Sequence, residues 1–567
     1  MPLQADTRAA QAADAYRYDE KSDFTGGLNL RADQFNIAEN ESPALLNVEV
    51  DPRGGVRRRD AVTKVNVTAL DDEIISLFTH YEAGTNQVLA ATLDTAITKS
   101  QIYYVADATG NFTGPIQVSG ANVLFDTAQP PRHVTFNDNT YIVNGALLHN
   151  DSGVTTSSAL KWDGATATAP LPDIDGSAGH FPCARYTTAW AEFVWVAYTL
   201  ESGTTHKNRV RFSAVNDAEN WTATDYIDID IGEDGDHITA IIPDADRLLV
   251  FKQNSIYAIY GFSRDSFEVR NITRTAGCRE GTQPVAATAG IFFWYAEEGV
   301  YIVNYDDVAW VFARIKPAMT YDVGQPALSL GTPPSMMWFD ERLWVSVDYQ
   351  SDDNISGSTQ NNRRNVFVWD PSLGPTGSWT RHDINARSLL AYRPSGDTHF
   401  GIAATSNITT VASFDRISKL DQNSDYDDYV GAVNEINSFY HTGWFVGNRP
   451  TFPKRWGKTR TVVLSDNDCV IVMYVYKDYD PSTALVGYSK TLTGLGTPAL
   501  WDAATSEWGD VEWQPEGTSD RYGFARWPTI GTAQAISLRF SVTPAPSTRG
   551  KWGITSIIGM YRTRRLR

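Results

Sequence analysis

Apolar residues occur along most of this chain in short runs of about four to eight positions, each bounded by turn-forming residues. Clear examples are Gly290 to Tyr295, Leu343 to Asp348 and Asn365 to Asp370. These runs are rich in β-branched and aromatic residues, which favour strands. The Ala-rich stretch from Thr7 to Tyr18 instead favours a helix, with a frayed terminus as the alternative. The pattern predicts an all-β protein with a short N-terminal helix or arm.

The strand runs come in groups of three or four that recur about every 40–50 residues. This spacing is typical of a β-propeller, in which small antiparallel sheets surround a central axis. We predict an irregular propeller of about six to seven blades over residues 71–430. Residues 1–70 would form an arm and a β-hairpin that edges or closes the propeller. Two packed β-sandwiches would produce a similar series of strands.

A second strand-rich region follows the polar, acidic stretch Asn423 to Tyr429, which we interpret as a linker. Residues 431–567 predict a C-terminal β-sandwich, whose length is usual for a domain. Alternation along Cys469 to Tyr476 indicates that one face of this strand is buried. The side chains that we expect on that face are Val470, Val472, Tyr474 and Tyr476.

Size and charge narrow the possible functions. The chain has 567 residues and a net charge of −19, so its overall field does not hold nucleic acid.

Its three cysteines lie far apart without C-x-x-C spacing, which argues against a disulfide scaffold or a zinc site. No signal peptide is evident, and the apolar run Ile291 to Ala296 is too short to span a bilayer. We therefore expect synthesis in a cytoplasm, no membrane-spanning segment and no cofactor.

Basic residues gather in two places despite the acidic composition. The sequence Asp51-Pro52-Arg53-Gly54-Gly55 predicts a tight turn, and arginines follow it. Two interpretations stay open: contact with an acidic partner subunit, or solubility and pairing with acidic neighbours within the chain. The hypothetical assembly residues are Arg53, Arg57, Arg58, Arg59, Arg562, Arg564, Arg565 and Arg567.

Acidic residues form two weak candidates for a cation site, because calcium prefers several oxygen ligands from a flexible loop. The first set is Asp228, Asp230, Asp234 and Asp236, and the second is Asp425, Asp427 and Asp428. The first set does not have the spacing of an EF-hand loop. The alternative is a strand with one solvated acidic face that ends in a turn.

Catalytic motifs are absent from the sequence. There is no H-E-x-x-H, no G-x-S-x-G elbow and no phosphate-binding glycine loop. A sialidase-type Asp box is also missing. Since propellers do host glycosidases with paired carboxylates, a polysaccharide-cleaving enzyme stays an alternative. We predict that the protein is not an enzyme.

Several segments, taken in order, resemble phage tail nozzle proteins (the tail tubular protein B group) and related propeller proteins of tail hubs. The opening combines a Gly-Gly start, an Asn-containing strand and a Gly-rich hairpin with arginines. The segments that carry the resemblance are Gly26–Asn29, Ala44–Asn47, Gly54–Arg59, Arg209–Trp221, Arg247–Gly261 and Trp552–Tyr561.

The resemblance implies a structural protein of the virion tail, made in the host cytoplasm. Nozzles of this kind form a homohexameric ring beneath the head-to-tail adaptor, and tail fibres or spikes attach to their sides. Double-stranded DNA passes through the ring during ejection without sequence-specific binding. Excess negative charge suits such a conduit, because retention of the phosphate backbone requires cationic contacts. The alternative is a receptor- or carbohydrate-binding propeller at the tail tip, where exposed Trp and Tyr would stack on sugar rings.

Overall fold

The structure is a computed structural model. It describes residues 17–32, 34, 36–82, 85–94, 96–126, 129–230, 235–296, 298–317, 333–348, 364–374, 376–396, 398–405, 415–422, 426–428, 433–447, 450–465, 469–480, 484, 486–492, 521–542 and 551–563. The helix expected at Thr7 to Tyr18 lies outside these residues, except that Arg17 and Tyr18 begin a strand.

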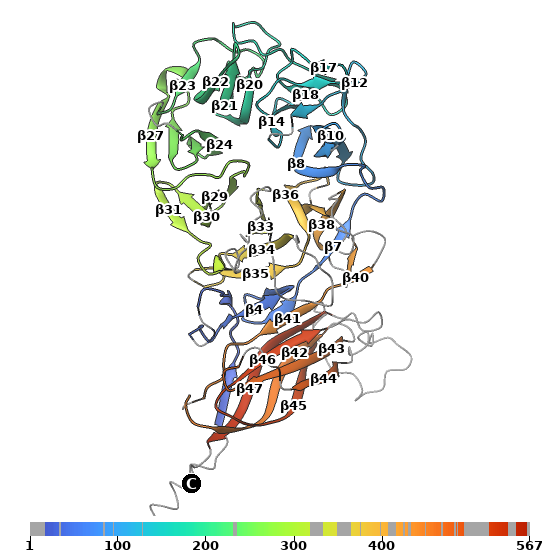
Figure 1. The fold of residues 1–567 in the computed structure, drawn as a ribbon, viewed down its shortest axis with the longest axis vertical. Coiled ribbons are helices and arrows are strands. Elements are labelled where there is room, and N and C mark those ends of the chain that lie inside the picture. Colours follow the sequence, from blue (N-terminus) through green and yellow to red (C-terminus); the bar gives the residue numbers. More distant parts are fainter. Residues whose placement is uncertain are drawn as a thin grey trace, which may run out of the picture.

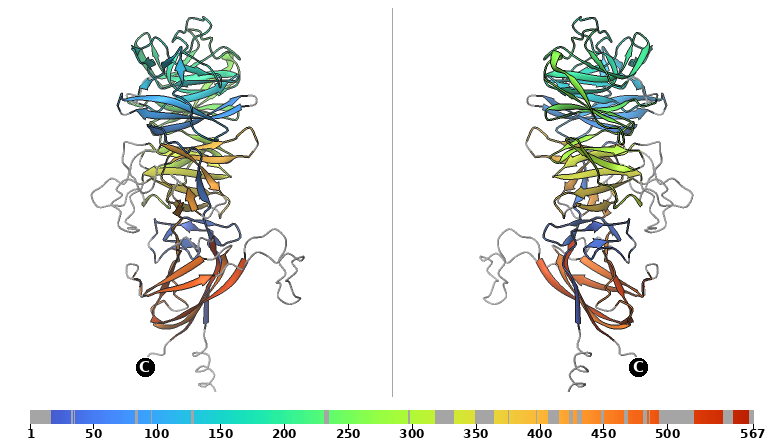
Figure 2. Two further views of the ribbon diagram at one scale, coloured as in Figure 1. Left: turned by 90° about the vertical axis from the view of Figure 1, so that its right-hand side faces the viewer. Right: turned by 90° about the vertical axis from the view of Figure 1, so that its left-hand side faces the viewer.

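The described chain is built almost entirely of strands, which confirms the all-β, propeller-like prediction. Figure 1 shows sheets arranged around a ring, with further sheets below it that contain the C-terminal strands. A short helical turn, η1 (Arg264–Ser266), interrupts the strands of the ring. In the side views of Figure 2 the ring is seen edge-on and the C-terminal sheets continue its long direction.

Three sheets of four strands each begin the ring. The first contains β8 (Glu73–Glu82), β9 (Thr85–Asp94), β10 (Lys99–Ala106) and β13 (Phe125–Asp126). The second contains β14 (Arg132–Phe136), β15 (Asn139–Val143), β18 (Leu160–Trp162) and β19 (Ala167–Thr168). The third contains β20 (Cys183–Trp190), β21 (Phe193–Glu201), β22 (Thr204–Phe212) and β23 (Tyr226–Asp228). Two small hairpins accompany them: β11 (Gln117–Val118) with β12 (Ala121–Asn122), and β16 (His149–Asn150) with β17 (Gly153–Val154).

The next two sheets repeat this antiparallel pattern. One contains β24 (Ile238–Asp244), β25 (Arg247–Lys252), β26 (Ile256–Tyr260) and β27 (Glu268–Thr273). The other contains β28 (Val285–Ala287), β29 (Gly290–Tyr295), β30 (Gly299–Asn304) and β31 (Asp307–Trp310).

The last two sheets of the ring each take in strands from the N-terminal part of the chain. One contains β32 (Ser335–Phe339), β33 (Arg342–Asp348), β34 (Arg364–Asp370) and β35 (Ser378–His382), extended by β2 (Gly27–Leu28) and β3 (Glu41–Ser42). The other contains β36 (Ala386–Tyr392), β37 (Phe400–Thr405), β38 (Arg416–Gln422), β7 (Ala61–Lys64), β39 (Tyr426–Asp428) and β40 (Val433–Glu435).

The first strand of each sheet faces the centre of the ring. In order, β8, β14, β20, β24, β28, β32 and β36 each contact the next, and β36 contacts β8. The ring is therefore closed. Strand β7 pairs with β38 in the last sheet, so a segment that precedes the first sheet in sequence completes the final one. Joining the two ends of the ring in one sheet resists its opening, because those backbone hydrogen bonds must then break.

Two sheets lie below the ring (Figure 1). The first contains β45 (Arg521–Ala533), β42 (Lys454–Ser465), β47 (Trp552–Thr563), β6 (Val56–Arg58), β5 (Val48–Val50) and β1 (Arg17–Lys21). The second contains β4 (Ala44–Leu46), β41 (Ser438–His441), β46 (Ile536–Val542), β43 (Cys469–Lys477) and β44 (Val486–Leu492).

The N-terminal segment is shared between both parts of the molecule. Residues 1–70, expected as a separate arm, are distributed in their described part over four sheets. The predicted hairpin is present as β5 and β6, with Gly54 at φ +97° in the turn. It pairs with β47 below the ring and not with the propeller edge, so the expected position of the hairpin is corrected. The strand that follows it, β7, closes the ring.

One hydrophobic core runs through the junction. Phe24, Leu45 and Val48 of the N-terminal segment are buried in the same cluster as Trp379 of the ring and Trp552 of the C-terminal strands. Buried apolar surface stabilises a fold by about 25 cal/mol per Å², so separating the two parts would expose this core at considerable cost. The acidic stretch interpreted as a linker contributes β39 to this compact region.

Strand β43 corrects one detail of the sequence interpretation. The alternation is present, but the buried side chains are Ile471, Met473 and Val475, together with Tyr476. Val470 and Val472 are only half-buried. Both faces of this strand carry apolar residues, so the pattern alone could not decide which face packs on the core.

Candidate functional site

Arg59, one of the arginines singled out from the sequence, is buried at the junction of the two parts. Its guanidinium donates to both carboxylate oxygens of Asp427, with Nη1–Oδ1 at 2.9 Å and Nη2–Oδ2 at 2.6 Å. Nη2 also lies 3.4 Å from Oδ1 of Asp383. The Arg59 side chain is 1% exposed, and the Asp427 oxygen Oδ1 further accepts the backbone N–H of Val62. Paired, forked hydrogen bonds of this kind are strong and directional.

Asn47 completes this buried network. Its side-chain Nδ2 donates to Oδ1 of Asp383 at 2.6 Å and to the carbonyl of Asn437 at 2.7 Å. Its Oδ1 accepts from Nε of Arg59 at 2.9 Å and from the backbone N–H of Asp383 at 3.0 Å. The residue has φ +52°, a left-handed conformation that Asn tolerates better than most residues. One side chain thus links the ring, the N-terminal segment and the C-terminal part.

The four N-terminal arginines do not form one outward patch, which corrects the assembly hypothesis for two of them. Arg58 and Arg59 are buried within the chain. The side chain of Arg53 is 82% exposed and lies 3.2 Å from Asp51, and that of Arg57 is 53% exposed and lies 3.4 Å from Glu49. Alternation along β6 explains the difference, because Arg57 and Arg58 point to opposite faces of the sheet.

The C-terminal arginines are only partly described. Arg562 lies in β47, opposite Arg455 of β42, and is half-buried. Arg564, Arg565 and Arg567 lie outside the described residues. Pairing within the chain therefore accounts for Arg59, whereas Arg53 and Arg57 remain candidates for contact with a partner.

A second charged cluster adjoins the junction. Arg342 lies 3.6 Å from Glu49, 3.5 Å from Asp421 and 2.5 Å from Asp340. The pKa of Asp421 is raised to about 7, first by burial and second by the nearby Glu49 carboxylate, while Arg342 acts in the opposite direction. The cluster therefore changes charge near neutral pH.

The predicted cation sites are not formed by the carboxylates that the structure describes. Asp228 is held by Arg209 through two hydrogen bonds of 2.8 and 2.9 Å. Asp230 accepts from the Tyr257 hydroxyl at 2.6 Å and from Arg274 at 3.1 Å. Other partners hold Asp236, which accepts from the backbone of Asn254 and the hydroxyl of Ser255. Each carboxylate already has its own donors, and Asp234 lies outside the described residues.

The second predicted set fares similarly. Asp427 is buried against Arg59, Asp425 lies outside the described residues, and Asp428 contributes its backbone to β39. Among the described residues, ligand atoms close enough for a metal ion occur together at Asp173, Asp175 and His180, all at least partly exposed. Sequence reasoning missed this group because its members belong to an irregular loop. Backbone turns already engage its carboxylates.

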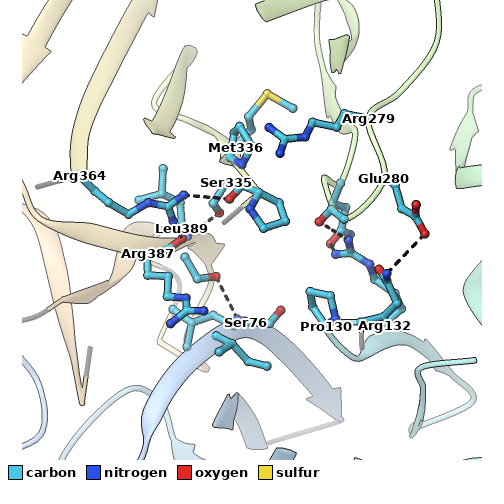
Figure 3. A pocket seen from close by; sticks show the side chains of 18 of the residues that line it. Ser76, Pro130, Arg132, Arg279, Glu280, Ser335, Met336, Arg364, Arg387 and Leu389 are labelled. Carbon is cyan, nitrogen blue, oxygen red and sulfur yellow. Dashed lines mark hydrogen bonds between the residues drawn. The ribbon is translucent and has the colours of Figure 1, made fainter. Parts of the chain in front are cut away.

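The ring encloses a cavity of about 670 Å³ at the inner ends of several sheets. Its walls come from β8, from β32 and β36, and from the segments that precede β14 and β28. Figure 3 shows Arg364 and Arg387 on one side of it, with Arg132 and Arg279 on the other. Among the described lining residues the charged ones are Arg132, Arg279, Glu280, Arg364 and Arg387. No motif links these positions in the sequence, so only ring closure brings them together.

Most large aromatic side chains pack inside the molecule. The fully buried ones include Trp195, Trp221, Trp294, Trp344 and Trp379 of the ring. The strongly exposed aromatic residues among those described are Tyr18, Tyr81, Tyr226, Phe262 and Tyr305. In the described part of the chain, no helix combines the length and apolar character needed to cross a membrane.

Comparisons with known proteins identify no family. No protein-family model matches the chain, and no curated protein matches it. Solved structures show distant likeness. An N-terminal BBS1 fragment crystallised with ARL6 has 11% identity and a TM-score of 0.36, covering 65% of this chain and 98% of that one.

Two further structures are comparable. The extracellular domain of the one-component system BT4673 from B. thetaiotaomicron has 12% identity and a TM-score of 0.37, covering 79% of this chain and 57% of that one. YCF48 bound to D1 peptide has 9% identity and a TM-score of 0.33, covering 67% of this chain and 98% of that one. Likeness at this level carries nothing about the function of this chain.

Proposed function

We propose that this chain is a structural protein of a bacteriophage tail that assembles into a homohexameric nozzle or hub. In this role it conducts double-stranded DNA during ejection and anchors the head-to-tail adaptor and the tail fibres or spikes. It is made in the host cytoplasm and incorporated into the virion tail. The proposal rests on the ordered sequence resemblance between Gly26 and Tyr561.

We also propose a finer description of the fold. The seven sheets whose first strands form the closed ring are the blades of a seven-bladed propeller. The two sheets that contain β41 to β47 form a β-sandwich. Their shared buried residues, among them Trp456, Ile471, Trp527 and Phe540, support this packing.

The observation that carries the functional proposal is the position of the resembling N-terminal segment. Gly26–Asn29 contributes β2 to the ring, whereas Ala44–Asn47 and Gly54–Arg59 contribute β4 and β6 to the two sheets below it. A subunit of a ring that guides DNA has to keep its shape while its neighbours press on it. A segment built into both parts, with buried ion pairs and a shared core, provides that rigidity.

The propeller cavity is not the route for DNA in this proposal. Its volume of about 670 Å³ is in the range of small-molecule sites, roughly 300–1,000 Å³. The conduit would lie between subunits, where the net charge of −19 limits attraction of the phosphate backbone. The exposed Arg53 and Arg57 are the candidates for subunit or adaptor contacts.

Mass and symmetry of the purified chain, alone and with its adaptor, test the proposal. Light scattering with size exclusion and negative-stain microscopy should give six copies and a sixfold ring. The double variant Arg53→Ala, Arg57→Ala should weaken assembly, whereas Arg270→Ala, an exposed arginine on the ring, should not. A trimer with glycan affinity would favour the receptor-binding alternative, and glycan turnover would favour an enzyme. A chain that stays monomeric with the adaptor present would overturn the nozzle proposal.

A further inference from the structure

The central cavity has a charge opposite to that of the chain as a whole. Its described lining contains four arginines against one glutamate, a net charge of +3, in a chain whose net charge is −19. The arginines come from β14, β34, β36 and the segment before β28, so three different sheets and one connecting segment contribute. Ring closure therefore concentrates positive charge at one place.

The one acidic side chain of the described lining is already engaged. Glu280 lies 2.5 Å from Arg185 and 3.5 Å from His237. It also accepts from Nε2 of Gln129 at 3.4 Å. Its carboxylate thus forms an ion pair with Arg185, which does not line the cavity. Arg387 is likewise paired with Glu73.

Neutral oxygens orient two of the other arginines. Arg132 donates to the side-chain carbonyl of Gln283 at 3.0 Å and to the backbone carbonyl of Gly281 at 2.8 Å. Arg364 donates to the backbone carbonyls of Arg387 and Pro333, at 2.6 and 2.9 Å. A carbonyl oxygen carries no net charge, so these hydrogen bonds fix the orientation of the two guanidinium groups. Burial also lowers the pKa of Arg132, which reflects the cost of keeping a cation in this environment.

The rest of the lining suits polar recognition of a compact ligand. Four carboxamide side chains line the cavity beside small aliphatic surfaces: Gln129, Gln253, Asn254 and Gln283. Amide N–H groups donate to oxygen atoms. The described lining has no aromatic ring on which a base or a sugar would stack. Recognition there depends on charge and hydrogen bonds.

We propose that the central cavity binds a small polyanion that carries at least two carboxylate or phosphate groups. Guanidinium groups match both kinds of oxyanion through paired N–H donors. Arginines on two sides of the cavity (Figure 3) would hold separate anionic groups of one ligand. The inference does not depend on the tail function, because it concerns a cavity within a single chain.

Titration calorimetry of the full chain at low salt, with citrate, pyrophosphate and glucose as probes, tests the proposal. We expect saturable binding of one citrate or pyrophosphate per chain, weakened by added salt. The tighter of the two shows whether the site prefers carboxylate or phosphate. Glucose, which is uncharged, should not bind. Absence of saturable binding with both anions would overturn the proposal.

Matched variants locate the binding. Arg279→Gln should weaken anion binding about tenfold, because a charged hydrogen-bond partner is lost. Arg279→Lys keeps the positive charge but lacks the paired N–H donors of a guanidinium, so it should weaken binding less than Arg279→Gln does. Arg270→Gln removes an exposed arginine of the outer surface and should leave affinity within about twofold. Equal affinity of Arg279→Gln and Arg270→Gln would overturn the placement in the cavity, whatever the oligomeric state.

Discussion

Arg59 and Asp427 form a buried, forked ion pair across 368 positions of sequence, with Nη2–Oδ2 at 2.6 Å and Nη1–Oδ1 at 2.9 Å. Arg59 lies between β6 and the ring-closing strand β7, and Asp427 lies in β39, which pairs with β7 in the last sheet of the ring. An arginine that looked like part of a surface patch is thus a structural element of the junction.

Arg59→Ala is expected to destabilise the protein by about 3–5 kcal/mol, because it leaves the Asp427 carboxylate buried without its partner. Arg53→Ala removes an exposed pair and is expected to cost at most about 1 kcal/mol. Urea unfolding of the two variants measures both values. Equal losses would contradict the assignment. A triple substitution of Arg57, Arg58 and Arg59 would not separate a defect in subunit assembly from a loss of folding stability, because two of these arginines are buried.

Asn47→Asp is expected to destabilise the fold by about 3 kcal/mol or more, because it places a carboxylate beside Asp383 in a buried site. Lower pH should partly restore stability, since one of the two carboxyl groups can then be protonated. Asn137→Asp is the matched control, because Asn137 is also left-handed, with φ +48°, but exposed. Thermal unfolding at pH 5 and pH 8 distinguishes the two. A pH-independent loss would indicate a different cause.

Gly27→Ala should destabilise the protein by about 3 kcal/mol. The residue has φ +62°, and a Cβ atom would lie 2.6 Å from the carbonyl oxygen of Trp379. Gly396→Ala is the control, since nothing lies within 4 Å of its Cβ position, and we expect a change below about 1 kcal/mol. Chemical unfolding compares them. A tolerated Gly27→Ala would show that β2 can move away from β35.

Asp421 makes stability depend on pH in a predictable direction. Its pKa is raised from 3.8 to about 7 on folding, mainly by burial. The protonated form therefore contributes stability that is complete below about pH 4. That contribution is lost as pH rises through about 7.

Asp421→Asn cannot titrate, so its stability relative to the native chain should rise between pH 4 and pH 7, by at most about 1.4 kcal/mol per pH unit. Unfolding free energies of both proteins at pH 5, 6, 7 and 8 measure the difference. Parallel pH curves would show that the Asp421 carboxyl group does not titrate in this range.

Much of the local structure follows from neighbouring residues. Alternating apolar runs and Gly, Asn and Asp at turns predict strands, and the turn at Asp51 to Gly55 lies between β5 and β6 as expected. Periodicity also predicts that β43 has a buried face. It could not decide between Ile471 and Val472, because both are apolar and the packing partner is remote in sequence.

Such local patterns could not predict contacts between residues that are far apart in the sequence. The sequence of a run of arginines does not show which of them forms an ion pair with a carboxylate more than 300 positions away. The cavity arginines are an example of the same limit, since no local spacing relates Arg132 to Arg364.

Local preference thus determined that this chain forms many short strands, with a turn after Val50, and the spacing of these strands predicted small sheets around a central axis. Tertiary structure alone decided that β7 closes the ring, that Arg59 is buried and that four arginines face one cavity. The physical reason is that strand formation depends on neighbours in sequence, whereas burial and charge pairing depend on contacts made only when distant segments meet.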